Sequence, residues 1–144
     1  MIEELFITNN AKTEKEVRMM SPLVLAYIGD AVLELYIRSY LVNKKTVSVN
    51  VLHKTATNYV KAKAQSMIVH TLKEELSEME WSYVKKGRNQ KTHTVAKNAS
   101  LQDYRYATGY ETLLGYLFLT KKTKRLEELI GKSIKIIENA EKRE

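Results

Sequence analysis

Two acidic residues stand in segments that are otherwise almost entirely apolar. Asp30 lies inside LAYIGDAVLELYI, and Glu111 lies inside YETLLGYLFL. A buried carboxylate destabilises a protein unless it is paired with a cation or binds a metal. Two explanations are therefore open. Each acid could form a structural ion pair, for instance with Arg38 or Arg105, or the two acids together could hold a divalent metal ion.

Oxygen ligands of this kind suit Mg²⁺, which takes one or two carboxylates and completes its shell with waters and phosphate oxygens. Such a metal activates water and stabilises in-line displacement at phosphorus. Glu34 lies one helical turn after Asp30, where it could support the site or form an ion pair. The three histidines are scattered and there is no cysteine, so we expect no site of other metal-ligand types and no disulfide framework.

The charge distribution favours a polyanionic partner. The chain has 144 residues and a net charge of +7, and no acid occurs between Glu34 and Glu74 or between Glu80 and Asp103. A one-sided basic surface attracts nucleic acid because each neutralised phosphate releases counterions. The apolar runs are too short to span a membrane and the acidic N-terminus does not match a secretion signal, so we expect a soluble cytoplasmic protein with no membrane contact.

Few helix breakers and apolar residues at helical spacing predict an all-α fold, a helical bundle forming a single domain over residues 1–144. The chain has only one proline and five glycines. We expect a long loop without periodicity over 87–100. The expected helices are one from the Ser21-Pro22 cap to about Val42, one long or two shorter helices over 51–76, one from the Ser77 capping box to Gly87, one over 101–122 and one over 123–144.

Several of these segments resemble the ribonuclease III family. LAYIGDAVLELYI is similar to that family's signature helix, and YATGYETLLGYLFL is similar to its second acidic motif. KKGRN before the loop, the Lys-Asn pair at 97–98 and YRYATGYE resemble Mini-ribonuclease III, the short form that has no double-stranded-RNA-binding domain. The resemblance covers roughly residues 20–135.

The resemblance implies a homodimeric endonuclease domain in which the signature helices of two subunits pack together. Each subunit would cut one strand of double-stranded RNA, with Asp30 and Glu111 as catalytic residues and ligands of Mg²⁺. Full-length members carry two further carboxylates at the positions of Ala26 and Thr108, and Mini-ribonuclease III lacks both. We therefore expect weaker Mg²⁺ binding than in full-length relatives, which a calorimetric titration would measure.

The same resemblance implies a precursor of large-subunit ribosomal RNA as the substrate, and it leaves room for a ribosomal protein that helps to present it. Double-stranded RNA is recognised mainly through its shape, phosphates and 2′-hydroxyls. Basic and amide side chains around the predicted loop are suited to that task. The expected RNA-binding residues are Lys85, Lys86, Arg88, Asn89, Lys91, Lys97 and Asn98.

Two other functions remain open from the sequence. The chain could be a non-catalytic RNA-binding or ribosome-associated protein on a ribonuclease III-like scaffold. It could also be a small helical DNA-binding protein, although residues 48–66 fit a helix-turn-helix only loosely. Because both Asp30 and Glu111 are present, the sequence favours the enzyme.

Overall fold

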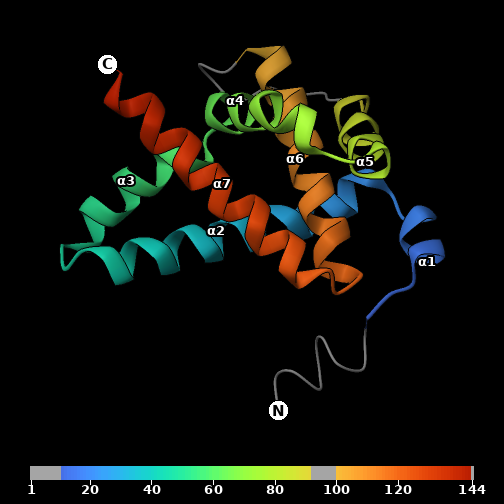
Figure 1. The fold of residues 1–144 in the computed structure, drawn as a ribbon, viewed down its shortest axis with the longest axis horizontal. Coiled ribbons are helices and arrows are strands. Elements are labelled where there is room, and N and C mark those ends of the chain that lie inside the picture. Colours follow the sequence, from blue (N-terminus) through green and yellow to red (C-terminus); the bar gives the residue numbers. More distant parts are fainter. Residues whose placement is uncertain (1–10, 92–99, 144) are drawn as a thin grey trace.

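The structure is a computed structural model that describes residues 11–91 and 100–143. Within these residues the regular structure is entirely helical, which confirms the predicted all-α fold (Figure 1). The elements are α1 (Glu14–Arg18), α2 (Pro22–Lys44), α3 (Val49–Val60), α4 (Ala62–Leu72), the 3₁₀ turn η2 (Lys73–Glu75), α5 (Glu78–Arg88), α6 (Leu101–Leu119) and α7 (Thr123–Lys142).

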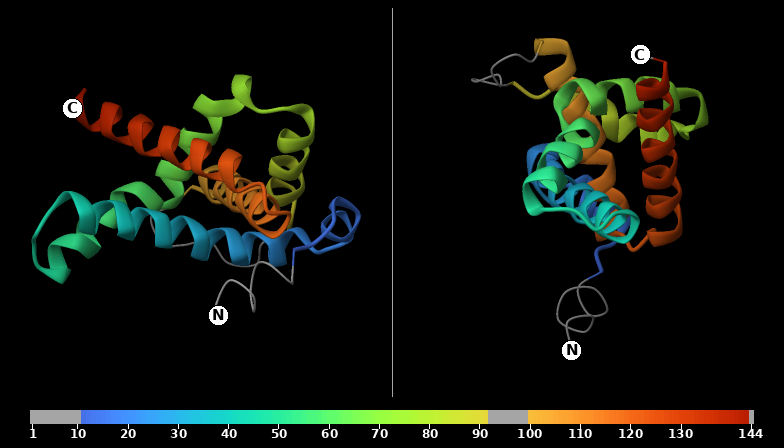
Figure 2. Two further views of the ribbon diagram at one scale, coloured as in Figure 1. Left: turned by 60° about the horizontal axis from the view of Figure 1, so that its bottom comes forward. Right: turned by 90° about the vertical axis from the view of Figure 1, so that its left-hand side faces the viewer.

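Helix α6 is the centre of the fold. It packs against α2, α4, α5 and α7, which surround it in the views of Figures 1 and 2. Between 107 and 117 all of its side chains are buried except that of Glu111, which is half-buried. A helix that is apolar nearly all round has neighbours on every side. The one acid on this stretch is therefore inside the molecule rather than on a solvated face.

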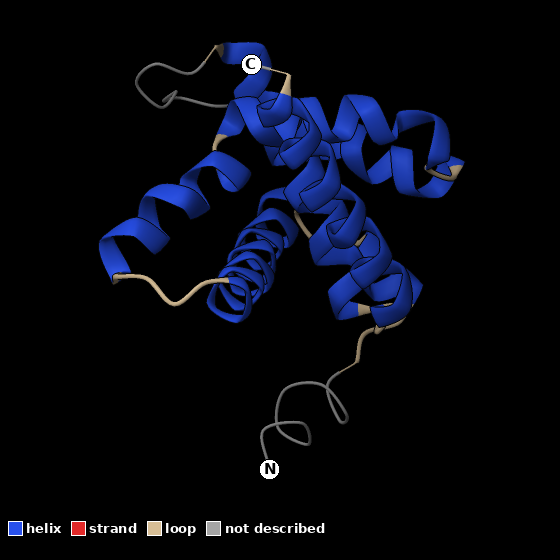
Figure 3. Cartoon of the chain, turned by 60° about the vertical axis from the view of Figure 1, so that its left-hand side comes forward, coloured by secondary structure: helices blue, strands red, loops and turns tan. Residues whose placement is uncertain are grey.

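The region predicted as one long or two shorter helices forms two. Helix α3 ends before Lys61, whose backbone is extended, and α4 begins at the next residue. The connections between helices are mostly short in Figure 3, where the described elements are all helices and loops. In 11–91 and 100–143 we find no helix that combines the length and the apolar composition needed to cross a bilayer.

Gly87 has a different role from the one predicted. We expected it to end the helix that begins at Ser77, but α5 continues to Arg88 and buries Gly87. A Cβ atom at Gly87 would lie 2.3 Å from the Thr112 hydroxyl oxygen and 2.8 Å from the Gly109 Cα. The glycine is there because α5 and α6 pack backbone against backbone, which leaves no room for a side chain.

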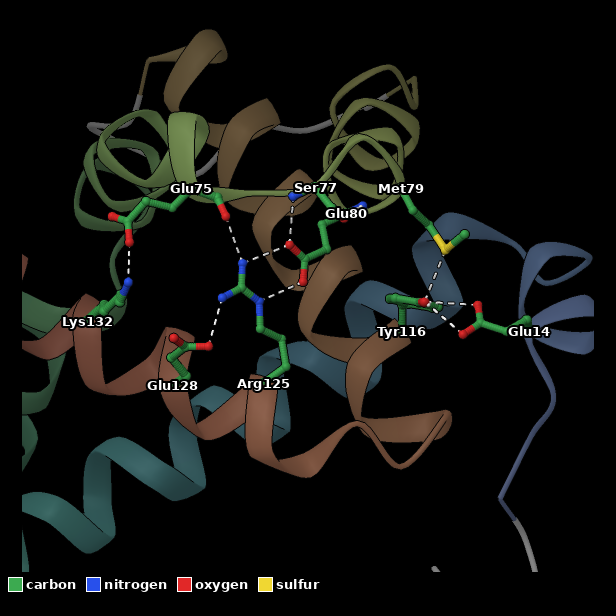
Figure 4. Close-up of polar contacts among 9 residues, drawn as sticks. All are labelled: Glu14, Glu75, Ser77, Met79, Glu80, Tyr116, Arg125, Glu128 and Lys132. Atoms are coloured by element: carbon green, nitrogen blue, oxygen red, sulfur yellow. Dashed lines mark hydrogen bonds and ion pairs between the residues drawn. The ribbon is translucent and has the colours of Figure 1, made fainter.

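Polar side chains connect the helices around this core (Figure 4). The Arg125 guanidinium of α7 donates two hydrogen bonds to the Glu80 carboxylate of α5, at 2.8 and 2.9 Å. It also donates to Glu128 and to the Glu75 carbonyl. Because Glu80 is buried, this fork satisfies a charge that would otherwise destabilise the fold.

Candidate active site

Asp30 and Glu111 come together because α2 and α6 touch through two glycines. A Cβ atom at Gly29 would lie 1.8 Å from the Glu111 carbonyl oxygen, and one at Gly115 would lie 1.9 Å from the Leu25 carbonyl oxygen. The two backbones therefore approach more closely than any side chain would allow. Asp30 follows Gly29 directly, so this contact places its carboxyl group beside that of Glu111.

The two carboxyl groups interact, and their environment opposes a double negative charge. Burial raises the pKa of Glu111 to about 8, and the nearby charges of Asp30 and Glu34 add to the shift. Burial and the charge of Glu34 also raise the pKa of Asp30, although a hydrogen bond with Glu111 lowers it. Asp30 is the more exposed of the two. The pair therefore favours either a proton or a cation between its oxygens.

Gln65 of α4 is a third residue at this site, and sequence reasoning missed it. Its amide nitrogen donates to the Glu111 carboxylate at 3.0 Å and to the Val60 carbonyl at 2.7 Å. Its amide oxygen is buried and has no hydrogen-bond partner within the described residues. An unpaired buried acceptor is unusual, so this oxygen is available to a donor such as water that enters with a ligand. The available signal was a polar residue on the apolar face of α4.

Comparisons with known proteins identify the family of this chain. The ribonuclease III domain model matches residues 23–122, a stretch that contains both carboxylates. The chain belongs to the ribonuclease III family. It is 48% identical to a Mini-ribonuclease 3 of Clostridium tetani over 92% of this chain and 88% of that protein, and 50% identical to one of Enterococcus faecalis over 84% and 93%.

A solved structure has a similar fold. The crystal structure of a Fusobacterium nucleatum protein superposes with a TM-score of 0.75 at 32% sequence identity, over 83% of this chain and 96% of that one. The family resemblance stated from the sequence is therefore confirmed. Ribonuclease III proteins are endoribonucleases, and this chain is an enzyme of that class.

Glu34 and the residues at positions 26 and 108 add no further carboxylate that is free to bind a metal at this site. Glu34 accepts a hydrogen bond from Arg38 at 3.1 Å, which is the structural ion pair considered for this helix face. At the two positions where the family resemblance implied further carboxylates in full-length members, Ala26 is buried and the Thr108 hydroxyl donates to the Tyr104 carbonyl. No ion pair within 11–91 and 100–143 joins Arg105 to Glu111, so the second suggested pairing is absent there.

The two carboxylates of Asp30 and Glu111 fit Mg²⁺ as a ligand pair. In the described parts of the chain, no three His, Cys, Asp or Glu residues gather closely enough to hold a metal. Asp30 and Glu111 would hold the ion with two carboxylates, and the Gln65 amide would position the Glu111 carboxylate. Mg²⁺ commonly binds with one or two carboxylates and otherwise keeps waters and substrate phosphate oxygens.

Five of the predicted RNA-binding residues fall within the described structure. Lys85 and Lys86 are exposed in the last turn of α5, and Lys86 lies 4.6 Å from the centre of the Tyr83 ring. Arg88 ends α5, Asn89 is its C-cap and Lys91 is exposed after it. The other two, Lys97 and Asn98, lie outside the described residues. The described cations therefore gather at one end of α5.

Proposed function

We propose that this ribonuclease III family member is a Mg²⁺-dependent endoribonuclease that cleaves double-stranded RNA. The observation that carries the proposal is the Asp30–Glu111 pair, held on two helices in backbone contact and surrounded by groups that disfavour its double charge. A catalytic metal site needs such a pair, whereas an inert scaffold would gain stability by replacing it.

The chain's own residues would divide the work at this site. Asp30 and Glu111 would hold the metal, and Gln65 would fix the orientation of the Glu111 carboxylate through its 3.0 Å hydrogen bond. When bound, Mg²⁺ activates water and neutralises the charge that develops on the phosphate. The raised pKa of Glu111 means that metal and proton compete for this carboxylate.

The basic end of α5, formed by Lys85, Lys86 and Arg88, supports duplex RNA as the substrate. These cations carry no sequence information, which suits recognition of RNA by shape and phosphates. The precursor of large-subunit ribosomal RNA, in the cytoplasm, is the physiological substrate that we propose, because the chain is close to Mini-ribonuclease 3 proteins over almost its whole length. Assistance by a ribosomal protein stays a prediction.

We also propose that the enzyme is a homodimer that associates through α2. One side of this helix exposes Val24, Tyr27, Ala31 and Leu35 at steps of three and four residues. Tyr27 is 78% exposed and Leu35 is 66% exposed. A run of large apolar side chains on one helix face is typical of an interface. Such a dimer would place one carboxylate pair in each subunit.

A substrate panel tests the proposed activity. Purified protein is incubated with an RNA duplex, its single strands, and a DNA duplex of the same sequence, each with Mg²⁺ or with EDTA. We expect the protein to cleave the RNA duplex in Mg²⁺ and not in EDTA, and to leave the single strands and the DNA duplex intact. Binding of the RNA duplex without cleavage in any metal would instead favour a non-catalytic RNA-binding protein. Cleavage of single strands at the same rate would contradict the assignment of the duplex as substrate.

A further inference from the structure

An open pocket of about 540 Å³ lies where α5 ends and α6 begins, apart from the two carboxylates. Its walls are polar. The pocket is lined by Arg88, Asn89, Gln102, Arg105 and Tyr106. Two of these residues are arginines, and both side chains are half-buried rather than spread over the surface. The loss of water around a guanidinium is normally compensated by a carboxylate.

Neither arginine forms an ion pair with any residue in 11–91 or 100–143. The Arg105 Nε atom is buried and has no hydrogen-bond partner within these residues. The sequence between α5 and α6 cannot supply a carboxylate either, since no acid occurs between Glu80 and Asp103. A buried donor without a partner destabilises the folded protein. Within the described residues the pocket is thus an arrangement of positive charge without a counter-charge, and an anion would complete it.

The second guanidinium is held in place by neutral neighbours. The Arg88 Nε donates to the Asn89 side-chain oxygen at 3.0 Å, and an Nη donates to the Tyr106 hydroxyl at 3.4 Å. The guanidinium carbon also lies 5.6 Å from the centre of the Tyr106 ring, which packs against His70 of α4 at 4.2 Å. These contacts hold the Arg88 side chain in one position and leave its positive charge without a counter-charge. A guanidinium group in this state is ready to bind an anion.

We propose that Arg88 and Arg105 together bind one backbone phosphate of the RNA, a short distance along the strand from the phosphate that is cut. This inference rests on the proposed function. Arg105 precedes Glu111 by six residues on α6, which corresponds to about 9 Å along the helix axis. Helix α4 connects the same two places, because Gln65 contacts Glu111 and His70 contacts Tyr106. Planar guanidinium groups match phosphate oxygens with paired hydrogen bonds.

Equilibrium binding of a labelled RNA duplex of about 20 base pairs, somewhat longer than the duplex that a double-stranded-RNA-binding domain spans, tests the pocket. The full chain is used in EDTA, so that cleavage does not intervene, and the dissociation constant is measured over a range of salt concentrations. The variants are Arg88→Gln, Arg105→Gln and the double variant. Arg18→Gln on α1 removes an exposed arginine outside the pocket and is the matched control. Thermal melting by circular dichroism confirms that each variant is folded.

Each single variant should weaken binding about tenfold and lower the slope of log K against log salt by about one unit, the value for one lost phosphate contact. In the double variant the slope should also fall by only about one unit, because both arginines hold the same phosphate. Arg105→Lys should keep the wild-type slope and bind less tightly, since it retains the charge without the fork. Arg18→Gln should match the wild type.

Two outcomes would overturn the pocket while leaving the nuclease assignment intact. In the first, the wild type cuts the duplex and the Arg88 and Arg105 variants bind it with wild-type affinity and slope. In the second, the double variant loses two units, which would mean that the arginines hold separate phosphates. A wild type that neither binds nor cuts the duplex would instead overturn the proposed function, and the pocket assignment with it.

Discussion

Of the two carboxyl groups at the candidate site, that of Glu111 lies in the environment that more strongly disfavours a negative charge. Burial raises its pKa to about 8, whereas its ordinary value is 4.5. Between these two values the unfolded chain ionises this carboxyl and the folded protein does not. The folded state therefore binds more protons, and the metal-free protein loses stability as the pH rises through this window.

Replacing this acid with an amide should remove that loss. We predict that Glu111→Gln unfolds less readily than the wild type in EDTA, with a free energy of unfolding that is higher by about 1–2 kcal/mol near pH 8 and almost equal near pH 5. Urea denaturation at the two pH values measures the difference. Equal free energies of unfolding for the wild type and Glu111→Gln near pH 8 would show that the folded protein accommodates an ionised Glu111 without losing stability.

Sequence reasoning singled out Asp30 and Glu111 because a charge within an apolar helix requires an explanation, and the structure brings the two residues together. It did not find Gln65, since a neutral amide is ordinary on a helix and its spacing does not show that it faces Glu111. Arg105 was considered only as a partner for an acid. Its pocket is formed by the ends of two helices that are separated in the sequence, so no local pattern marks it.

The contact between helices α2 and α6 brings the carboxyl groups of Asp30 and Glu111 together. We predict that Gly29→Ala lowers the free energy of unfolding by about 3 kcal/mol and abolishes most of the cleavage, because the new Cβ must push Glu111 away from Asp30. The matched control is Gly131→Ala on α7, where a Cβ would meet nothing within 4 Å. That change should raise stability by about 0.5–1 kcal/mol through helix propensity. Similar effects of the two substitutions would contradict this account.

The link between α5 and α7 should make stability depend on pH in the acidic range. Burial alone would raise the pKa of Glu80, but hydrogen bonds from Arg125 and from the Ser77 backbone hold the pKa below its usual value of 4.5. This carboxylate therefore stabilises the fold above that value, and the contribution is lost as the pH falls through the lower pKa of the folded state.

Glu80→Gln isolates the charge, because glutamine preserves the capping box at the start of α5. We predict that it lowers the free energy of unfolding by about 1–3 kcal/mol near pH 7 and has little effect near pH 3. Glu128→Gln, which removes the more exposed partner of Arg125, should leave stability almost unchanged, because solvent screens this pair. Denaturation at both pH values checks the difference, and an equal loss at low pH would rule out the charge as its cause.

Helix starts were easier to predict than helix ends and packing. Ser21 and Ser77 each accept a backbone hydrogen bond from the first turn of the helix that follows, as their sequence context indicated. Gly87 was wrongly assigned as a helix end, because a glycine that ends a helix and one that permits close packing look alike in a sequence. Helix α1, with its own capping box at Thr13, is short and was not predicted.

For the whole molecule, the exposed apolar side of α2 predicts association. Leu35→Lys should convert a dimer into a monomer in sedimentation experiments at micromolar concentration, because a lysine cannot be buried without a partner. Val49→Lys, at a residue of α3 that is 64% exposed, replaces an equally accessible apolar side chain elsewhere. It should leave the dimer intact. A monomeric wild type, or dissociation by both substitutions, would contradict the assignment of α2 as the interface.

We propose that the two carboxylates on α2 and α6, those of Asp30 and Glu111, carry out metal-dependent cleavage of duplex RNA. The most direct test compares the wild type, Asp30→Asn, Glu111→Gln and Asp103→Asn, which alters the only other aspartate in the chain. Duplex binding is measured in EDTA and cleavage in Mg²⁺. We predict that all four proteins bind the duplex and that only the wild type and Asp103→Asn cut it. Cleavage by Asp30→Asn or Glu111→Gln at the wild-type rate would show that the active site lies elsewhere.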